Sequence, residues 1–216
     1  MLDWITSNAN LVSAGVQIVT AAVWIVYLQI FITSYRRQKR SNILINRIAG
    51  NADRAHLMVG NMGAEPIYVS AVLVDVLVDG ETHCAAVTES VQIEEDREAL
   101  TNSRQGPLKS AETRDIGALG DITDRALEHF GLSDRSMEVE EITVTVAAEG
   151  TYDAEIVAGQ QAFWVHQRDD RRIFMPKWSR TRQVRGRRQR KRLSVRLDGL
   201  LRTEARTIEE EEKSSA

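Results

Sequence analysis

Hydrophobic residues follow two patterns along this chain, one continuous and one alternating. Residues 4–35 include no Asp, Glu, Lys or Arg, and the 23 residues from Leu11 to Thr33 form the most apolar part of this run. A helix rises about 1.5 Å per residue, and the hydrocarbon core of a bilayer is about 30 Å thick. Trp4 and Tyr35 lie where aromatic side chains anchor a span at the two interfaces. The pattern predicts a transmembrane helix over residues 11–35.

Cations stand on one side of this segment only. Four of them follow it directly: Arg36, Arg37, Lys39 and Arg40. The N-terminal side has Asp3 and no Lys or Arg. Because Lys and Arg beside a span stay in the cytoplasm, we expect a short N-terminus outside, the remaining chain inside, and a bacterial inner membrane as the location.

A cleaved signal peptide is the competing interpretation of the same segment. Such a peptide begins with a positive region and has an apolar stretch of about 7–15 residues. Here the N-terminal flank lacks the positive region, and the apolar run is longer. The sequence therefore favours a permanent single-pass anchor.

A polar stripe runs along one face of the predicted span. Its members recur every three or four residues: Ser13, Gln17, Thr20, Trp24 and Tyr27. Residues at this spacing are neighbours on a helix, and small residues nearby allow a second helix to approach closely. The amide of Gln17 needs a partner in lipid. The stripe predicts contact with another transmembrane helix; the alternative is that these polar residues are tolerated in an apolar span.

After the cationic cluster, apolar residues alternate as they do in half-buried strands. The predicted strands are Ile43–Ile45, Ala55–Val59, Ile67–Val78, Glu81–Val87, a short edge strand at Pro107-Leu108 and Thr113–Ile116, Glu138–Ala147 and Asp153–Val165. Turns are expected at Gly60–Gly63, at Gly150 and at Asp79-Gly80, which is typical of a tight hairpin. Residues 94–106 predict an exposed loop.

One helix is expected within this region, from Asp121 to Phe130. Four of its residues share a face: Ile122, Ala126, Leu127 and Phe130. Gly131 then provides a C-terminal stop. Many short strands with turn signals and one helix favour an antiparallel β-sandwich, because the strand–helix alternation of a parallel α/β fold is missing.

The segment Val59–Val69, with the sequence VGNMGAEPIYV, resembles a strand–turn–strand passage of immunoglobulin-like domains in membrane-anchored bacterial proteins. The resemblance covers these 11 residues and the general layout. The Cys–Trp–Cys framework of true immunoglobulin domains is missing. The resemblance implies an immunoglobulin-like architecture and no particular activity.

Charge is distributed unevenly along the chain. The net charge is -3 overall, -13 over residues 41–176 and +7 over residues 177–216. Six cations concentrate in the last part: Arg185, Arg187, Arg188, Arg190, Lys191 and Arg192. Leucines then recur at helical spacing, which predicts an amphipathic helix over Arg190–Glu211. Its cations come first and its acidic residues last, against the helix dipole, so docking onto a partner would have to stabilise it.

Three partners remain open for this basic tail. Anionic lipid of the inner leaflet attracts Lys and Arg near the surface, and the tail's own acidic domain or a partner protein is the second. Nucleic acid is the third, and it is disfavoured because no Phe, Tyr or Trp follows Trp178 to stack on bases. A solvated, disordered tail is the remaining alternative.

The sequence has no motif for catalysis or for a metal. It contains no phosphate loop, no GxSxG elbow and no HExxH pair. Cys84 is the only cysteine, and the four histidines show no ligand spacing. We therefore predict a protein that is not an enzyme, has no cofactor or metal, and holds protein partners at the membrane. The alternative is an electrostatic tether that binds anionic lipid or nucleic acid through the tail; a hydrolase with scattered active-site residues is a third possibility.

The expected division of the chain follows from these patterns. The segments are a short N-terminus over 1–10, a span over 11–35, a basic linker over 36–42, a cytoplasmic β-sandwich over 43–178 and a basic, then acidic, tail over 179–216.

Overall fold

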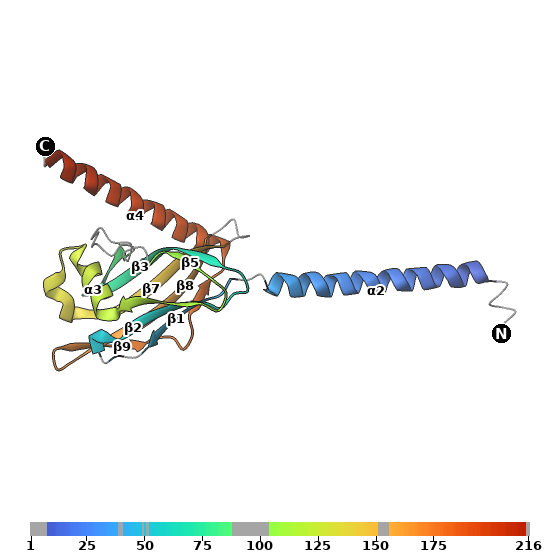
Figure 1. Ribbon diagram of the computed structural model, residues 1–216, viewed down its shortest axis with the longest axis horizontal. Coiled ribbons are helices and arrows are strands. Elements are labelled where there is room, and N and C mark those ends of the chain that lie inside the picture. Colours follow the sequence, from blue (N-terminus) through green and yellow to red (C-terminus); the bar gives the residue numbers. More distant parts are fainter. Residues whose placement is uncertain are drawn as a thin grey trace. The chain divides into compact units, whose positions relative to one another are not determined.

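The computed structural model describes residues 8–38, 41–48, 50, 52–87, 104–150 and 156–214, and it divides into two compact units (Figure 1). In the first unit, Met1–Arg40, the described residues 9–38 form the helix α2 (Ala9–Gln38). Its stretch Ser13–Tyr35 is long and apolar enough to cross a bilayer, as the sequence predicts. The helix continues through Arg36 and Arg37, which therefore do not lie in a linker.

The second unit, Ser41–Ala216, is here called the β domain. It consists mainly of antiparallel strands with a few helices, which confirms the predicted class at that level. Its elements are β1 (Ile43–Ile48), η1 (Ala52–Arg54), β2 (His56–Asn61), β3 (Ile67–Val78), β4 (Glu81–Ala86), β5 (Gly106–Leu108), β6 (Thr113–Ala118), α3 (Leu119–Glu128), η2 (Ser133–Glu138), β7 (Val139–Gly150), β8 (Val157–Arg168), β9 (Arg171–Pro176), β10 (Arg182–Val184) and α4 (Arg187–Ser214).

The described strands form two sheets that share one core. The first sheet has the order β1-β2-β6, and the second has the order β10-β8-β7-β3-β4, with β5 beside β3 and β9 beside β8. Buried side chains of both sheets meet in the core, among them Ile45, Leu57, Val74, Val144 and Phe163. Burying these apolar surfaces together is the main driving force for folding the β domain.

The longest predicted strand and its hairpin agree with the structure. β3 spans Ile67–Val78, as predicted, and it pairs with β4 across the turn at Asp79 and Gly80. Their φ angles are 51° and 76°. A two-residue hairpin turn of this kind needs positive φ at both positions, which Asp and Gly tolerate better than most residues.

Several predicted boundaries were wrong. Gly60 and Asn61 belong to β2, and Gly150 ends β7 rather than lying in a turn. The turn after β2 starts later because the Asn61 side chain organises it: its Nδ2 donates to the carbonyl oxygens of Glu65 and Leu108. The predicted single edge strand around Pro107 is two strands, β5 and β6.

The predicted helix is displaced toward its N-terminus. α3 ends at Glu128, so Phe130 lies beyond it and is 38% exposed, whereas Ile122, Ala126 and Leu127 are buried. Gly131 has a φ of 65°, as a helix stop requires. Most of the predicted loop at 94–106 and the start of the predicted strand at Asp153 lie outside the described residues.

The β domain extends further along the chain than predicted. β9 and β10 were missed, and β10 pairs with β8 through Val184 and Ala158. The tail therefore does not begin at residue 179, because the segment through residue 184 is part of the second sheet.

Side chains from this segment complete the edge of β1. Thr181 Oγ1 accepts from Ile45 N at 2.8 Å and donates to Ile45 O at 3.0 Å. Gln183 Oε1 accepts from Ile43 N at 3.1 Å, and its Nε2 donates to Ile43 O at 2.6 Å. Two side chains thus bind the backbone groups that a neighbouring strand would otherwise pair, and they join the two sheets.

Candidate interaction surface

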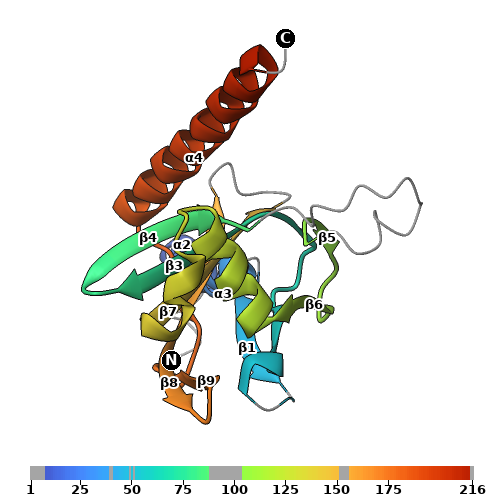
Figure 2. The same cartoon turned by 90° about the vertical axis from the view of Figure 1, so that its left-hand side faces the viewer.

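α4 packs its apolar face on the outer side of the second sheet. Leu193 is 7% exposed and contacts a cluster of small and apolar residues: Ala71, Leu73, Ala147, Ala158 and Val184. Leu197 and Leu200 pack against the same cluster. Figure 2 shows the first turns of α4 near β4 and the later turns leading away from the sheet. The first half of the tail is therefore docked on its own domain.

An ion pair fixes this helix on the sheet. Arg196 Nη1 lies 3.2 Å from Asp75 Oδ2, and Arg196 Nη2 forms a second, shorter hydrogen bond to Oδ1. Burial alone would lower the pKa of Arg196, but the hydrogen bonds and charge of Asp75 outweigh it and raise this pKa. Arg196 therefore stays charged at the place where α4 packs on the sheet.

Cys84 lies beside this ion pair. Burial, followed by the charge of Asp75, raises the pKa of the Cys84 thiol to about 12. A thiol is nucleophilic only as the thiolate, so Cys84 is protonated and unreactive at neutral pH. Its position under α4 indicates a packing role.

The structure separates the cations of the tail into two groups. Arg190 is half-buried, with Nε 3.4 Å from Val184 O, and Arg196 is paired with Asp75. The exposed predicted site residues are Arg185, Arg187, Arg188, Lys191 and Arg192. Arg182, also exposed, stacks over the ring of Trp178 with its Cζ 3.8 Å from the ring centroid.

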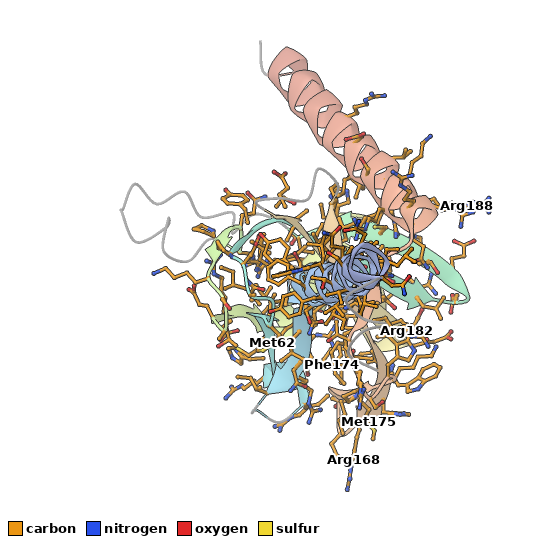
Figure 3. The ribbon with its side chains drawn as sticks, turned by 90° about the vertical axis from the view of Figure 1, so that its right-hand side faces the viewer. Met62, Arg168, Phe174, Met175, Arg182 and Arg188 are labelled. Carbon is orange, nitrogen blue, oxygen red and sulfur yellow. The ribbon has the colours of Figure 1, made fainter. Side chains whose placement is uncertain are left out.

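Five exposed cations of this segment are here called the basic surface. Its members are Arg182, Arg185, Arg188, Lys191 and Arg192, all exposed. The surface begins where the chain enters the β domain, because Gln183 binds the backbone of Ile43, the first residue of β1. Figure 3 labels Arg188, Arg182 and Arg168 at three separate places on the domain. Arg182 pairs with Gln160 of β8, eight residues before Arg168 on that strand.

The four predicted membrane-stop cations lie before this entry point. Arg36 and Arg37 are in α2, but their side chains, together with Lys39 and Arg40, lie outside the described residues. In sequence, Arg40 precedes Ile43 by only three residues.

The polar stripe lies on α2, and its five members are all exposed. Thr20 Oγ1 donates to Val16 O at 2.8 Å, so this hydroxyl is satisfied within the helix. Trp24 and Tyr27 pack edge to face, with ring centroids 6.3 Å apart. Contact of Ser13 and Gln17 with another helix stays a prediction.

A second basic region lies at the opposite end of β8. An open hollow of about 620 Å³ is lined by Arg47, Gly50, Ala52, Arg168, Asp169, Arg171 and Ile173. Arg47 donates to Phe174 O, and Arg168 Nε lies 3.7 Å from Asp169 Oδ2. Neither a nucleophile with an adjacent base nor a set of metal ligands lines this hollow among the described residues.

Arg172 is a buried cation whose role is structural. Its Nε lies 2.8 Å from Asp53 Oδ1, and its Nη1 lies 2.7 Å from Asp124 Oδ1. These bonds tie β9 to η1 and to α3. The carboxylates of Asp53 and Asp124 thus hold β9, η1 and α3 together.

Comparison with known proteins adds little to this geometry. No protein-family model matches the chain, and no curated protein matches it. Among solved structures, a crystal structure of a protein from Archaeoglobus fulgidus is similar at 8% identity, with a TM-score of 0.19, over 67% of this chain and 91% of that chain. At that TM-score the likeness carries no argument about fold or function.

Proposed function

We propose that this chain is a membrane-anchored, non-enzymatic interaction protein. In this proposal α2 crosses the bacterial inner membrane and presents the β domain, an immunoglobulin-like β-sandwich, to the cytoplasm. The observation that carries it is the exposure of α2, since every side chain from Ser13 to Tyr35 is exposed in the structure. So much apolar surface is unfavourable in water, and a bilayer covers it.

The orientation rests on the cations beside the span. Four lie on the C-terminal side and none on the N-terminal side, so the positive-inside rule favours a cytoplasmic β domain. The non-enzymatic role rests on a sequence without catalytic motifs.

A pair of reporters tests the anchor and its orientation. We expect a fluorescent protein fused after Ala216 to be fluorescent, and alkaline phosphatase fused at the same place to be inactive, because that enzyme needs export. We also expect the chain in the membrane fraction after carbonate washing. Its measured mass should show that the first residues are retained. Active phosphatase, or a mature chain that lacks α2, would contradict the proposal.

The partner of the span is expected on the polar stripe. Gln17→Leu should reduce the recovery of a copurifying membrane protein in mild detergent, because it removes the amide that needs an internal partner. Gln29→Leu is the matched control, since about 100° of rotation per residue puts Gln29 on another face of α2. Recovery of the chain alone, as a monomer, would contradict the proposed role as an interaction protein.

A second candidate function is an electrostatic tether. It is favoured by the basic surface, whose five cations are exposed while the apolar face of α4 is covered. The sequence leaves open a free, disordered basic tail. In the structure these cations are held on the β domain instead.

A further inference from the structure

We propose that the basic surface binds the anionic phospholipid headgroups of the leaflet from which α2 emerges, and so holds the β domain against the membrane face. This inference rests on the proposed membrane span. It commits the basic surface to one ligand chemistry, the phosphodiester of a lipid headgroup, and it gives α4 a defined task.

The first step is the direction in which the cations face. Arg188, Lys191 and Arg192 lie on the side of α4 away from Leu193, because residues three and four apart share a helix face. Val195 belongs to the same outer side and is 63% exposed, whereas Leu193 is 7% exposed. The cations therefore face solvent while the leucines face the sheet.

The second step is that α4 cannot also insert into the membrane as an amphipathic helix. Interfacial helices bury an apolar face among the acyl chains, but the apolar face of α4 already contacts Ala71, Leu73 and Ala158. Only charge is left for the membrane. The contact is therefore electrostatic, sensitive to salt, and independent of apolar insertion.

The third step is the length of the connection. Residues 39–42 join Gln38 of α2 to Ile43 of β1, and a fully extended connection of this length reaches at most about 18 Å. Gln183 binds Ile43 and stands next to Arg182 and two residues before Arg185. The connection is therefore short, and Gln183 binds the residue at its C-terminal end.

Local electrostatics also favours a role in binding. Arg188 stands in the first turn of α4, where a cation is unfavourable because the helix dipole is positive there. Residues that break such a local rule are expected at functional sites. An anionic surface would turn this unfavourable placement into an attraction.

The side chain of Arg182 is already ordered before it binds a lipid headgroup. Its guanidinium stacks over Trp178 at 3.8 Å and remains exposed. Stacking limits the side chain to few conformations, so binding orders it at little further loss of entropy. Trp178 is thereby used by Arg182 and is not a platform for nucleic-acid bases.

Energy transfer to the membrane surface tests the inference. The full chain, with Cys84→Ala and a donor dye on Val195→Cys, is placed in nanodiscs that contain an acceptor-labelled lipid. One set of discs is phosphatidylcholine alone, and the other includes phosphatidylglycerol. We expect higher transfer with phosphatidylglycerol at 50 mM salt and equal transfer at 500 mM salt, because salt screens this attraction.

Matched double variants locate the contact. Arg188→Gln with Lys191→Gln should lower the ratio of docked to undocked domain about 25-fold, or about fivefold per cation. Arg168→Gln with Arg171→Gln removes as many charges at the far end of β8, about 33 Å from Ala158 along the strand, and should leave transfer unchanged.

The possible outcomes separate the two proposals. A chain that stays in solution without detergent overturns the span itself. A chain that inserts but shows the same transfer in both lipids, or an increase that survives Arg188→Gln with Lys191→Gln, overturns the inference alone. Because the lipid and salt comparisons use the unsubstituted surface, they decide the question even if this variant fails to fold. Binding of duplex DNA or single-stranded RNA to the phosphatidylcholine discs, lost in the same variant, with no effect of phosphatidylglycerol, would assign the surface to nucleic acid and overturn the inference.

Discussion

Arg196 of α4 binds Asp75 of β3 across 121 residues of sequence, with Nη1 3.2 Å from Oδ2. The Asp75 side chain is 15% exposed and that of Arg196 is 39% exposed. A carboxylate so nearly buried is unfavourable without a counter-charge. The pair therefore sets the position of α4 on the sheet, while Leu193 supplies the apolar contact.

Breaking this pair should loosen α4 before it unfolds the β domain. For Asp75→Asn we expect the unfolding free energy to fall by about 1–3 kcal/mol, between the values for exposed and buried pairs. Amides of residues 193–200 should exchange faster with solvent deuterium, because the helix opens locally. Asp198→Asn, which changes an exposed acid of the same helix, is the control. Unchanged exchange in Asp75→Asn would show that the pair does not position α4.

Leu193 should account for most of the apolar contribution of α4. Leu193→Ala is expected to lower the unfolding free energy by about 2–5 kcal/mol, as other truncations of buried leucines do. Val195→Ala should stay within about 0.5 kcal/mol, because Val195 is exposed. Urea unfolding in detergent, followed by the fluorescence of Trp164 and Trp178, measures both. Equal effects of the two substitutions would contradict the docking of α4.

Cys84 should report the docking of α4 through its reactivity. Its pKa of about 12 stands against an ordinary value of 9.0, so its thiolate population at pH 8 is about a thousandfold below that of a free cysteine. We expect slow alkylation by iodoacetamide in the native chain and faster alkylation in Leu193→Ala. Native alkylation as fast as that of the urea-unfolded chain would disprove the burial of this thiol.

The same shift predicts a loss of stability at alkaline pH. Because the folded chain keeps Cys84 protonated to about pH 12 and the unfolded chain only to about pH 9, the folded state loses stability as pH rises through this window. Below pH 9 the contribution is fully present. Cys84→Ser should therefore show a smaller loss of unfolding temperature between pH 8 and pH 10.5 than the unsubstituted chain. An equal loss would mean that other groups control the alkaline transition.

The sequence predicts those elements that residues close together in the chain stabilise. β3 was assigned correctly because it is rich in β-branched residues and ends at Asp79-Gly80. Its run Ala71-Val72-Leu73-Val74 is buried throughout, and a continuous apolar run is typical of a strand covered on both faces. This was the available signal that something packs on the outer side of the sheet, and Asp75, directly after the run, was the signal for a cationic partner.

β9 and β10 could not be found in the same way. β9 begins with Arg171-Arg172 and β10 with Arg182, so both resemble solvated basic segments in a linear sequence. Arg172 is buried only because Asp53 and Asp124, 119 and 48 residues away, bind it. β10 is three residues long, and its place depends on β8 and on the side-chain contacts to β1. Such contacts join distant parts of the chain, and periodicity does not reveal them.

The hydrogen bonds between Gln183 and the backbone of β1 should contribute strongly to the stability of the β domain. Gln183→Leu keeps much of the side chain's volume but removes both partners of the Ile43 backbone. An unsatisfied buried backbone group costs about 1–3 kcal/mol, so we expect a loss of this order in urea unfolding. Ser179→Ala, at an exposed position of the same segment, should have little effect. A neutral Gln183→Leu would mean that water replaces the amide at this edge.

Arg188 should affect stability and membrane contact in opposite directions. Removing its charge from the first turn of α4 relieves the unfavourable interaction with the helix dipole, so Arg188→Gln should raise the unfolding free energy by about 0.3–1 kcal/mol. The same change should lower energy transfer to discs that contain phosphatidylglycerol. Arg202→Gln, an exposed cation beyond the first turn, should give no such stabilisation. If Arg188 served to hold α4 on the sheet, its loss would reduce stability and membrane contact together, so a gain in stability with a loss of lipid contact separates a binding role from a structural one.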